Sequence, residues 1–168
     1  MATYVAQCVI GSRSLARIPG ARDAAWVALL GLPPYSAFFS GGAVGPDTWG
    51  LLVADESGKP TATFALDGTL PGGDAFGWGT RWTPANPPPK GTSLEVWRKW
   101  CLQRDRVMMA HGAGLVADGW TVRVLALLDP ESKTKGTKYS AQEADRLGLP
   151  VTVLGWDARG RRFRTWEL

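Results

Sequence analysis

The chain lacks any apolar stretch near the roughly 20 residues that a membrane-spanning helix needs. It has only one histidine and two cysteines, Cys8 and Cys101, which do not have the spacing of metal ligands. We therefore predict two reduced, buried cysteines, no metal site and no cofactor. The apolar start, residues 1–11, has no basic residue before it, so we expect a first strand rather than a signal peptide, in a cytoplasmic protein.

The common catalytic and nucleotide-binding motifs are also missing. There is no Ser-His-Asp set, no Cys-His pair, no Walker motif and no Gly-x-Gly-x-x-Gly. The single histidine, His111, falls near the end of a predicted helix, where a cation suits the helix dipole, so we interpret it as structural.

The composition is that of a globular protein. The 168 residues are 45% apolar and 20% charged, which fits one domain over residues 1–168. Residues 1–89 carry 5 basic and 6 acidic groups, whereas residues 90–168 carry 14 and 9. This excess of positive charge either favours an anionic partner near the second half or marks solvated faces.

Apolar runs alternate with amphipathic segments along the chain. Strands that are apolar throughout and separated by helices are buried on both faces and hence parallel. The pattern predicts an α/β fold, a single doubly wound Rossmann-like domain with a mostly parallel five-stranded sheet and helices on both faces. The expected strands are residues 4–10, 35–39, 61–66, 122–128 and 151–154, and the expected helices are 21–30, 46–57, 93–112 and 138–147.

Two stretches depart from this alternation. Residues 67–92 hold six glycines and five prolines, and they form either a lid over a site or a surface insertion packed by its own aromatic residues. The basic tail, residues 159–166, alternates enough to predict a last edge strand. Its arginines either contact nucleic acid or protect the sheet edge by their charge.

Two glycine loops are expected at the carboxyl ends of strands, where each precedes a helix. A strand, a glycine turn and a helix start leave unpaired backbone N–H groups beside a positive dipole end, which suits a phosphate. The first loop contains Ser40, Gly41, Gly42, Gly45 and Asp47; the second contains Lys135, Gly136 and Thr137, with Thr137 expected as the N-cap. We predict one binding site for a phosphorylated small molecule.

Further residues are candidates for the same site. Arg104 lies on the apolar face that Leu94, Trp97, Cys101 and Met108 share, so it either pairs with Asp47 or Asp105, extends to solvent, or reaches the ligand. Asp47 either stabilises the helix dipole or binds ribose hydroxyls. Ser12 and Arg13 end the first strand at the same edge and could donate to an anion.

Four motifs together resemble the SLOG superfamily, in particular its YspA-like branch. They are Gly11-Ser12-Arg13, the loop from Ser40 to Asp47, Arg104-Asp105-x-x-Met108, and Ser132-Lys133-x-x-Gly136-Thr137 followed by Gly148-Leu149-Pro150-Val151. The resemblance implies a Rossmann-like fold that binds nucleotides or ligands derived from them, often as a dimer. The superfamily includes the Lonely Guy phosphoribohydrolases and the DNA-processing protein of transformation.

The chain departs from the phosphoribohydrolase pattern at one decisive position. Ser140 stands where those enzymes have a glutamate, and a carboxylate is needed to stabilise charge on the sugar or to activate water. The leading hypothesis is therefore a homodimeric nucleotide binder with a sensing or carrier role. The alternatives are an N-glycosidase acting on nucleoside monophosphates or ADP-ribose-like ligands, and a single-stranded nucleic-acid-binding accessory protein.

Overall fold

The computed structural model describes residues 3–64 and 91–168, so the segment 67–90 of the predicted insertion lies outside the described residues. The strands are β1 (Val5–Gly11), β2 (Ala37–Ser40), β3 (Thr61–Thr63), β4 (Thr121–Leu128), β5 (Val151–Asp157) and β6 (Arg162–Thr165). The helices are η1 (Arg13–Arg17), α1 (Ala21–Leu30), α2 (Pro46–Glu56), α3 (Leu94–Ala117) and α4 (Gly136–Arg146). No described helix is long and apolar enough to cross a membrane.

The strands form one sheet in the order β3-β2-β1-β4-β5-β6. The first five strands run parallel, and β6 pairs antiparallel with β5 at the edge. This confirms the predicted doubly wound α/β fold and its last edge strand. The chain reverses its winding direction between β1 and β4, and ligands in such folds bind outside the carboxyl ends of the strands at that point.

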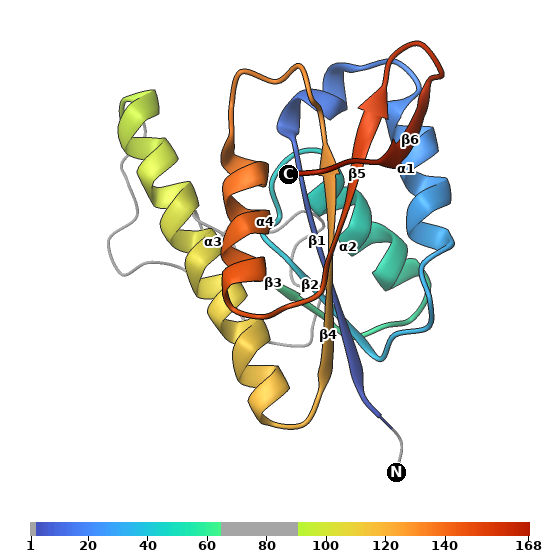
Figure 1. Ribbon diagram of the computed structural model, residues 1–168, viewed down its shortest axis with the longest axis vertical. Coiled ribbons are helices and arrows are strands. Elements are labelled where there is room, and N and C mark those ends of the chain that lie inside the picture. Colours follow the sequence, from blue (N-terminus) through green and yellow to red (C-terminus); the bar gives the residue numbers. More distant parts are fainter. Residues whose placement is uncertain (1–2, 65–90) are drawn as a thin grey trace.

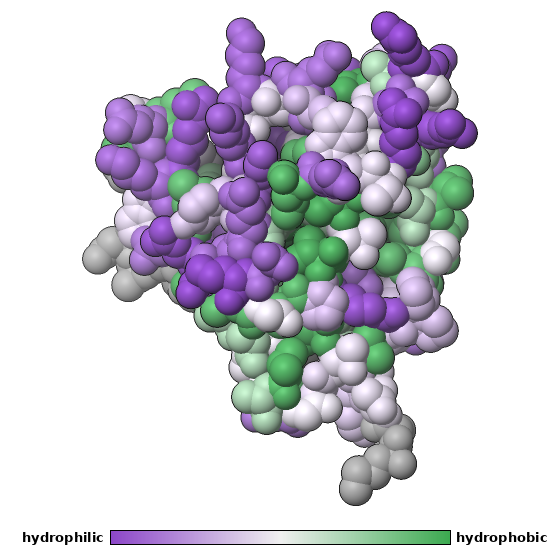
Figure 2. Space-filling model, in the orientation of Figure 1, coloured by the Kyte–Doolittle hydropathy of each residue, from purple (hydrophilic) through white to green (hydrophobic). Residues whose placement is uncertain are grey.

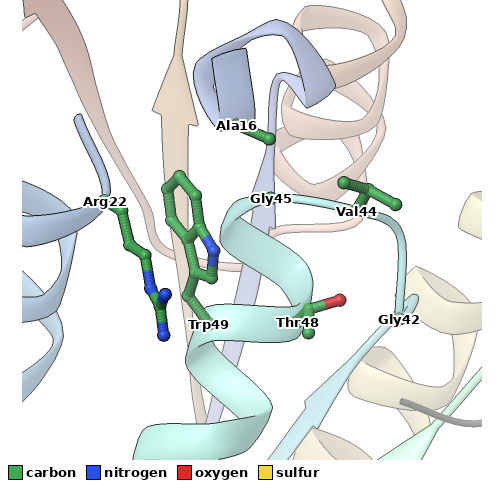
Figure 3. Close-up of a pocket in the computed structure, with 7 residues that line it drawn as sticks. All are labelled: Ala16, Arg22, Gly42, Val44, Gly45, Thr48 and Trp49. Atoms are coloured by element: carbon green, nitrogen blue, oxygen red, sulfur yellow. The ribbon is translucent and has the colours of Figure 1, made fainter. Parts of the chain in front are cut away.

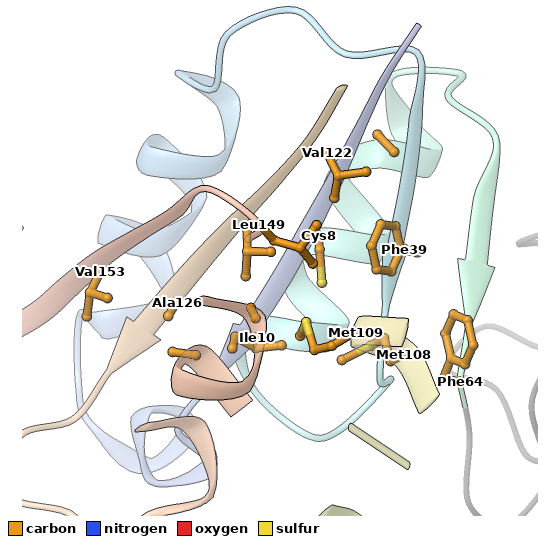
Figure 4. Packing of buried hydrophobic residues seen from close by; sticks show 14 of the residues in the cluster. Cys8, Ile10, Phe39, Phe64, Met108, Met109, Val122, Ala126, Leu149 and Val153 are labelled. Atoms are coloured by element: carbon orange, nitrogen blue, oxygen red, sulfur yellow. The ribbon is translucent and has the colours of Figure 1, made fainter. Parts of the chain in front are cut away.

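The helices cover both faces of the sheet, α1 and α2 on one and α3 and α4 on the other (Figure 1). One core lies between the sheet and α3 and α4, and includes Cys8, Phe39 and Met108 (Figure 4). A second core lies under α1 and α2, and includes Val9, Phe38 and Leu51. Neighbouring strand residues thus point to opposite cores, which is why the strands read as continuous apolar runs.

Three details differ from the sequence prediction. A short 3-10 helix, η1, follows β1 and was not predicted. Helix α4 begins at Gly136 with Lys135 as its N-cap, so the expectation that Thr137 caps it is wrong. The predicted apolar face of α3 is buried at Arg104 and Met108, but Leu94 is 63% exposed, so the first turn of this helix does not pack on the sheet.

Candidate functional site

The loop between β2 and α2 presents several backbone N–H groups at the carboxyl edge of the sheet. Gly42 and Gly45 have φ angles of 69° and 101°, which only glycine adopts readily. The backbone N–H groups of Gly42, Val44 and Gly45 donate no hydrogen bond to any described residue. Helix α2 starts directly after Gly45, so its positive dipole end faces the same region. This loop has the backbone geometry of an anion site.

Arg104 and Asp47 meet behind this loop, at Gly41. Nη1 of Arg104 donates to the carbonyl oxygens of Gly41 at 2.5 Å and of Phe64 at 3.1 Å. A Cβ atom built on Gly41 would lie 2.6 Å from Cζ of Arg104 and 2.9 Å from Oδ2 of Asp47. Glycine is therefore required here for close approach, and Arg104 holds the loop from its buried side.

The second partner of Arg104 is its neighbour in sequence. Nε of Arg104 donates to Oδ1 of Asp105 at 2.5 Å, and Arg104 is 5% exposed. Of the structural alternatives for Arg104, pairing with Asp105 is the one that the structure shows. Burial acts to lower the pKa of Arg104, but the carboxylates of Asp105 and Asp47 raise it above the ordinary value. A permanently charged guanidinium thus stands among carbonyl and carboxylate oxygens.

Asp105 connects this pair to α4. The hydroxyl of Ser140 lies 2.5 Å from Oδ2 of Asp105 and 2.9 Å from the carbonyl oxygen of Gly136, and can donate to either. Ser140 therefore joins the first turn of α4 to α3. The carboxylate nearest to the position of the missing glutamate is Asp105, and it is already paired with Arg104.

Asp47 is a buried carboxyl group with a raised pKa. Burial raises its pKa to about 6, while the positive charges of Arg104 and Arg13 act in the opposite direction. The backbone N–H of Gly11 donates to its Oδ1 at 3.0 Å. Asp47 thereby ties the end of β1 to the start of α2, and its side chain faces inward rather than toward solvent.

Two predicted site hydroxyls have structural partners. The hydroxyl of Ser40 donates to the carbonyl oxygen of Val9 at 2.6 Å. Oγ of Ser12 accepts from the backbone N–H of Asp129 at 3.0 Å. Both therefore hold strand ends together at the carboxyl edge of the sheet.

Asp129 is a residue that sequence reasoning missed. It follows β4 directly, is 8% exposed, and its Oδ2 accepts from the hydroxyl of Ser14 at 2.5 Å. A polar residue after a buried strand, just before Pro130, was the signal that could have found it. Its carboxylate thus joins η1 to the end of β4, and its negative charge at this edge disfavours a phosphate beside it.

Arg13 spans the carboxyl edge from β1 toward α3. Its side chain is exposed, and its Nη2 donates to Sγ of Cys101 at 3.4 Å. The positive charge of Arg13 also acts to lower the pKa of Asp47, so the two side chains face one another across this edge. That Arg13 binds an anion stays a prediction.

The first loop also borders an open pocket of about 440 Å³ (Figure 3). It lies on the α1 and α2 side, and Figure 3 shows the Arg22 side chain on one side and the β2–α2 loop on the other. The lining residues are Ala16, Arg22, Gly42, Val44, Gly45, Thr48 and Trp49. Of the predicted site residues only Gly42 and Gly45 line it, and Arg22 and Trp49 were missed because they come from segments that the sequence pattern marks only as helix.

The second glycine loop stands apart from this pocket. Gly136 is connected to the Arg104 cluster through Ser140. Lys135 is exposed, and neither Lys135 nor Thr137 lines the pocket. The structure thus brings together Gly41, Asp47 and Arg104 as a buried support, and places the open pocket on the other side of the same loop. Among the described residues, no group of three or more His, Cys, Asp or Glu side chains could hold a metal ion.

Comparison with known proteins identifies a similar fold but no family. No family model matches the chain, and no curated protein matches it. The X-ray structure of DNA processing protein A (DprA) from Streptococcus pneumoniae matches with a TM-score of 0.59 at 20% sequence identity. The match covers 89% of this chain and 50% of that chain, so the sequence spans half the length of that protein. The similarity confirms the Rossmann-like fold that the sequence resemblance implied.

Proposed function

We propose that this protein binds a nucleotide or a related phosphorylated small molecule in the pocket beside the loop of residues 41–45. The observation that carries the proposal is that Gly42, Val44 and Gly45 line the pocket and that their N–H groups donate to no described residue. Backbone donors at the start of α2 stabilise a phosphate without a dedicated side chain.

The pocket supplies the other groups that such a ligand needs. Its volume of about 440 Å³ lies within the range of small-molecule sites. Arg22 adds a positive charge at its rim, and Trp49 and Val44 provide apolar surface for a sugar or a base. The cluster of Arg104, Asp105 and Asp47 holds the loop in the required conformation and is a positioning element in this proposal.

The same geometry favours binding over catalysis. A phosphoribohydrolase needs a carboxylate free to act on the sugar. Ser140 replaces the glutamate, and Asp105 is engaged by Arg104 and Ser140. We therefore assign a sensing or carrier role; the release of free base from nucleoside monophosphates would contradict it. The YspA-like relationship, the cytoplasmic location and the homodimer remain predictions from the sequence.

Titration calorimetry with thymidine and adenosine 5′-monophosphates, the matching nucleosides and inorganic phosphate tests the proposal. We expect at least one monophosphate to bind and its nucleoside to bind at least tenfold more weakly. Ala16→Phe should abolish binding, because Ala16 is an exposed residue that lines the pocket. Ala110→Phe is the matched control, since Ala110 is exposed on α3 and does not line the pocket. Equal binding by both variants would refute the site.

A further inference from the structure

Exposed arginines gather near the pocket from two separate parts of the chain. Four come from the C-terminal hairpin: Arg159, Arg161, Arg162 and Arg164. Two others, Arg17 and Arg22, come from η1 and α1. In the view of Figure 2, strongly hydrophilic side chains stand out at the upper right, where Figure 1 places the turn between β5 and β6.

The hairpin reaches the pocket across the first turn of α1. Nη2 of Arg161 lies 3.0 Å from where a Cβ atom of Gly20 would stand, and Gly20 is the N-cap of α1. Arg22, two residues further on, lines the pocket. Arg161 and Arg22 therefore both lie at the first turn of α1, which separates the pocket from the β5–β6 turn.

Most of this positive charge has no acidic partner. Arg164 pairs with Asp157 at 3.4 Å, whereas Arg17, Arg22, Arg159 and Arg161 form no ion pair with a described residue. The N-terminal end of α1 carries positive dipole charge, so Arg161 at this end raises the local potential further. An anion that lies across these groups would relieve the repulsion between them.

Protection of the sheet edge does not account for this arrangement. Charges that block edge pairing are needed on the edge strand itself, which is β6. Arg159 and Arg161 lie in the turn outside β6, and Arg17 and Arg22 belong to other elements. Several guanidinium groups suit a series of phosphates, because each can bind a phosphate through two N–H groups. Cζ of Arg22 lies over the ring of the half-buried Trp26, 5.6 Å from the ring centroid, and this pair offers a flat surface against which a base of a single strand could lie.

We propose that the ligand is the phosphorylated end of a single-stranded nucleic acid. Its terminal phosphate occupies the β2–α2 loop pocket, and its following phosphates lie on Arg22, Arg161 and Arg159. This inference rests on the proposed function, since a pocket that accepts the phosphate of a mononucleotide accepts the same group at the end of a strand.

Competition binding with unlabelled ligands tests this proposal. The ligands are thymidine 5′-monophosphate and single-stranded 12-mers of thymidylate with a 5′-phosphate, with a 3′-phosphate or without a terminal phosphate. We expect one phosphorylated 12-mer to bind at least tenfold more tightly than the mononucleotide and at least threefold more tightly than the unphosphorylated 12-mer. A 12-mer that binds no better than the mononucleotide would overturn the proposal.

The double variant Arg159→Ser/Arg161→Asn isolates the arginine surface. Asparagine is chosen because residue 161 has a φ angle of 48°, which asparagine tolerates. We expect this variant to bind the 12-mer about tenfold more weakly than the native protein and to show a weaker dependence of that affinity on salt concentration. Its affinity for the mononucleotide should stay within twofold of the native value. The control Arg98→Ser/Lys99→Ser removes the same charge from exposed positions of α3. It should leave the affinity for both ligands unchanged.

The two proposals fail in different ways. If the mononucleotide binds and Ala16→Phe blocks it, but neither chain length nor the turn arginines matter, only the present inference is refuted. If the mononucleotide does not bind and the terminal phosphate has no effect on the 12-mer, the pocket itself is wrong. Equal affinity for a blunt duplex of the same length would refute the preference for a single strand.

Discussion

Asp47 is the residue whose chemistry departs most from its ordinary behaviour. Its carboxyl group is 4% exposed, accepts a hydrogen bond from Gly11 and faces the charges of Arg104 and Asp105. The sequence predicted that Asp47 and Arg104 belong to one site, because the glycine loop places Asp47 at a helix start and the apolar periodicity places Arg104 on a buried helix face. It placed Arg104 on the apolar face of its helix, but it could not decide whether Arg104 pairs with a carboxylate or reaches a ligand, nor predict that Asp47 faces inward, since both depend on how α2 and α3 are rotated about their axes.

The raised pKa of Asp47 has a consequence for stability. Between its ordinary value of 3.8 and its folded value of about 6, the folded protein holds a proton that the unfolded chain releases. The contribution of this group to the free energy of unfolding therefore falls as pH rises from about 4 to about 6, by up to about 1.4 kcal/mol per pH unit, and is constant above pH 7.

Urea unfolding of the native protein and of Asp47→Asn at several pH values measures this effect. We expect the stability of the native protein relative to the variant to fall between pH 4.5 and pH 7. Burial lowers the pKa of His111, but His111 titrates in both proteins, so its effect cancels in the comparison. Asp55→Asn, at an exposed position of the same helix, should show no such trend. A parallel pH dependence for Asp47→Asn and the native protein would contradict the assignment.

At the scale of elements, the contact between the β2–α2 loop and α3 organises the site. The sequence located the loop, both helices and the carboxyl edge from glycine positions and apolar periodicity. It missed Arg22 and Trp49, because their role arises from the packing of α1 beside α2 and not from any motif. It also missed Asp129, whose hydrogen bonds with Ser12 and Ser14 join the end of β4 to the segment that follows β1.

Gly41→Ala tests the close approach of the loop to α3. The added methyl group would stand 2.6 Å from the Arg104 guanidinium, so the buried cluster must shift. We expect a loss of about 1–3 kcal/mol in the free energy of unfolding, measured with urea. Gly114→Ala is the matched control on α3, where nothing lies within 4 Å of the new atom and alanine favours the helix. It should be neutral or stabilising, and a similar loss in both variants would contradict the contact.

At the scale of the whole molecule, one sheet carries two cores. The prediction of a doubly wound fold succeeded because strands buried on both faces read as unbroken apolar runs. The extra edge strand was also predicted, from the alternation of arginines with Phe163 and Trp166, although its antiparallel direction and the place of the hairpin beside α1 were not. That place follows from the packing of Phe163 on Trp156 and on the core under α1, which no local pattern signals.

Because both cores share the same strands, we expect the domain to unfold in a single transition. Met109→Ala and Leu51→Ala each remove a fully buried side chain, one from each core. Each substitution should lower the free energy of unfolding by about 2–5 kcal/mol. Tryptophan fluorescence and far-ultraviolet circular dichroism should report the same unfolding midpoint in urea. Separate midpoints for the two probes would show that the two sides unfold independently.

The direction of β1 has a practical consequence for binding measurements. The strand runs from the edge where the chain starts to the edge where the pocket lies (Figure 1). Its seven residues span roughly 20 Å. A protein immobilised on a sensor through its first residues would present the pocket and the arginine hairpin to the flowing solution. Attachment through the C-terminus would instead bring the surface close to β6.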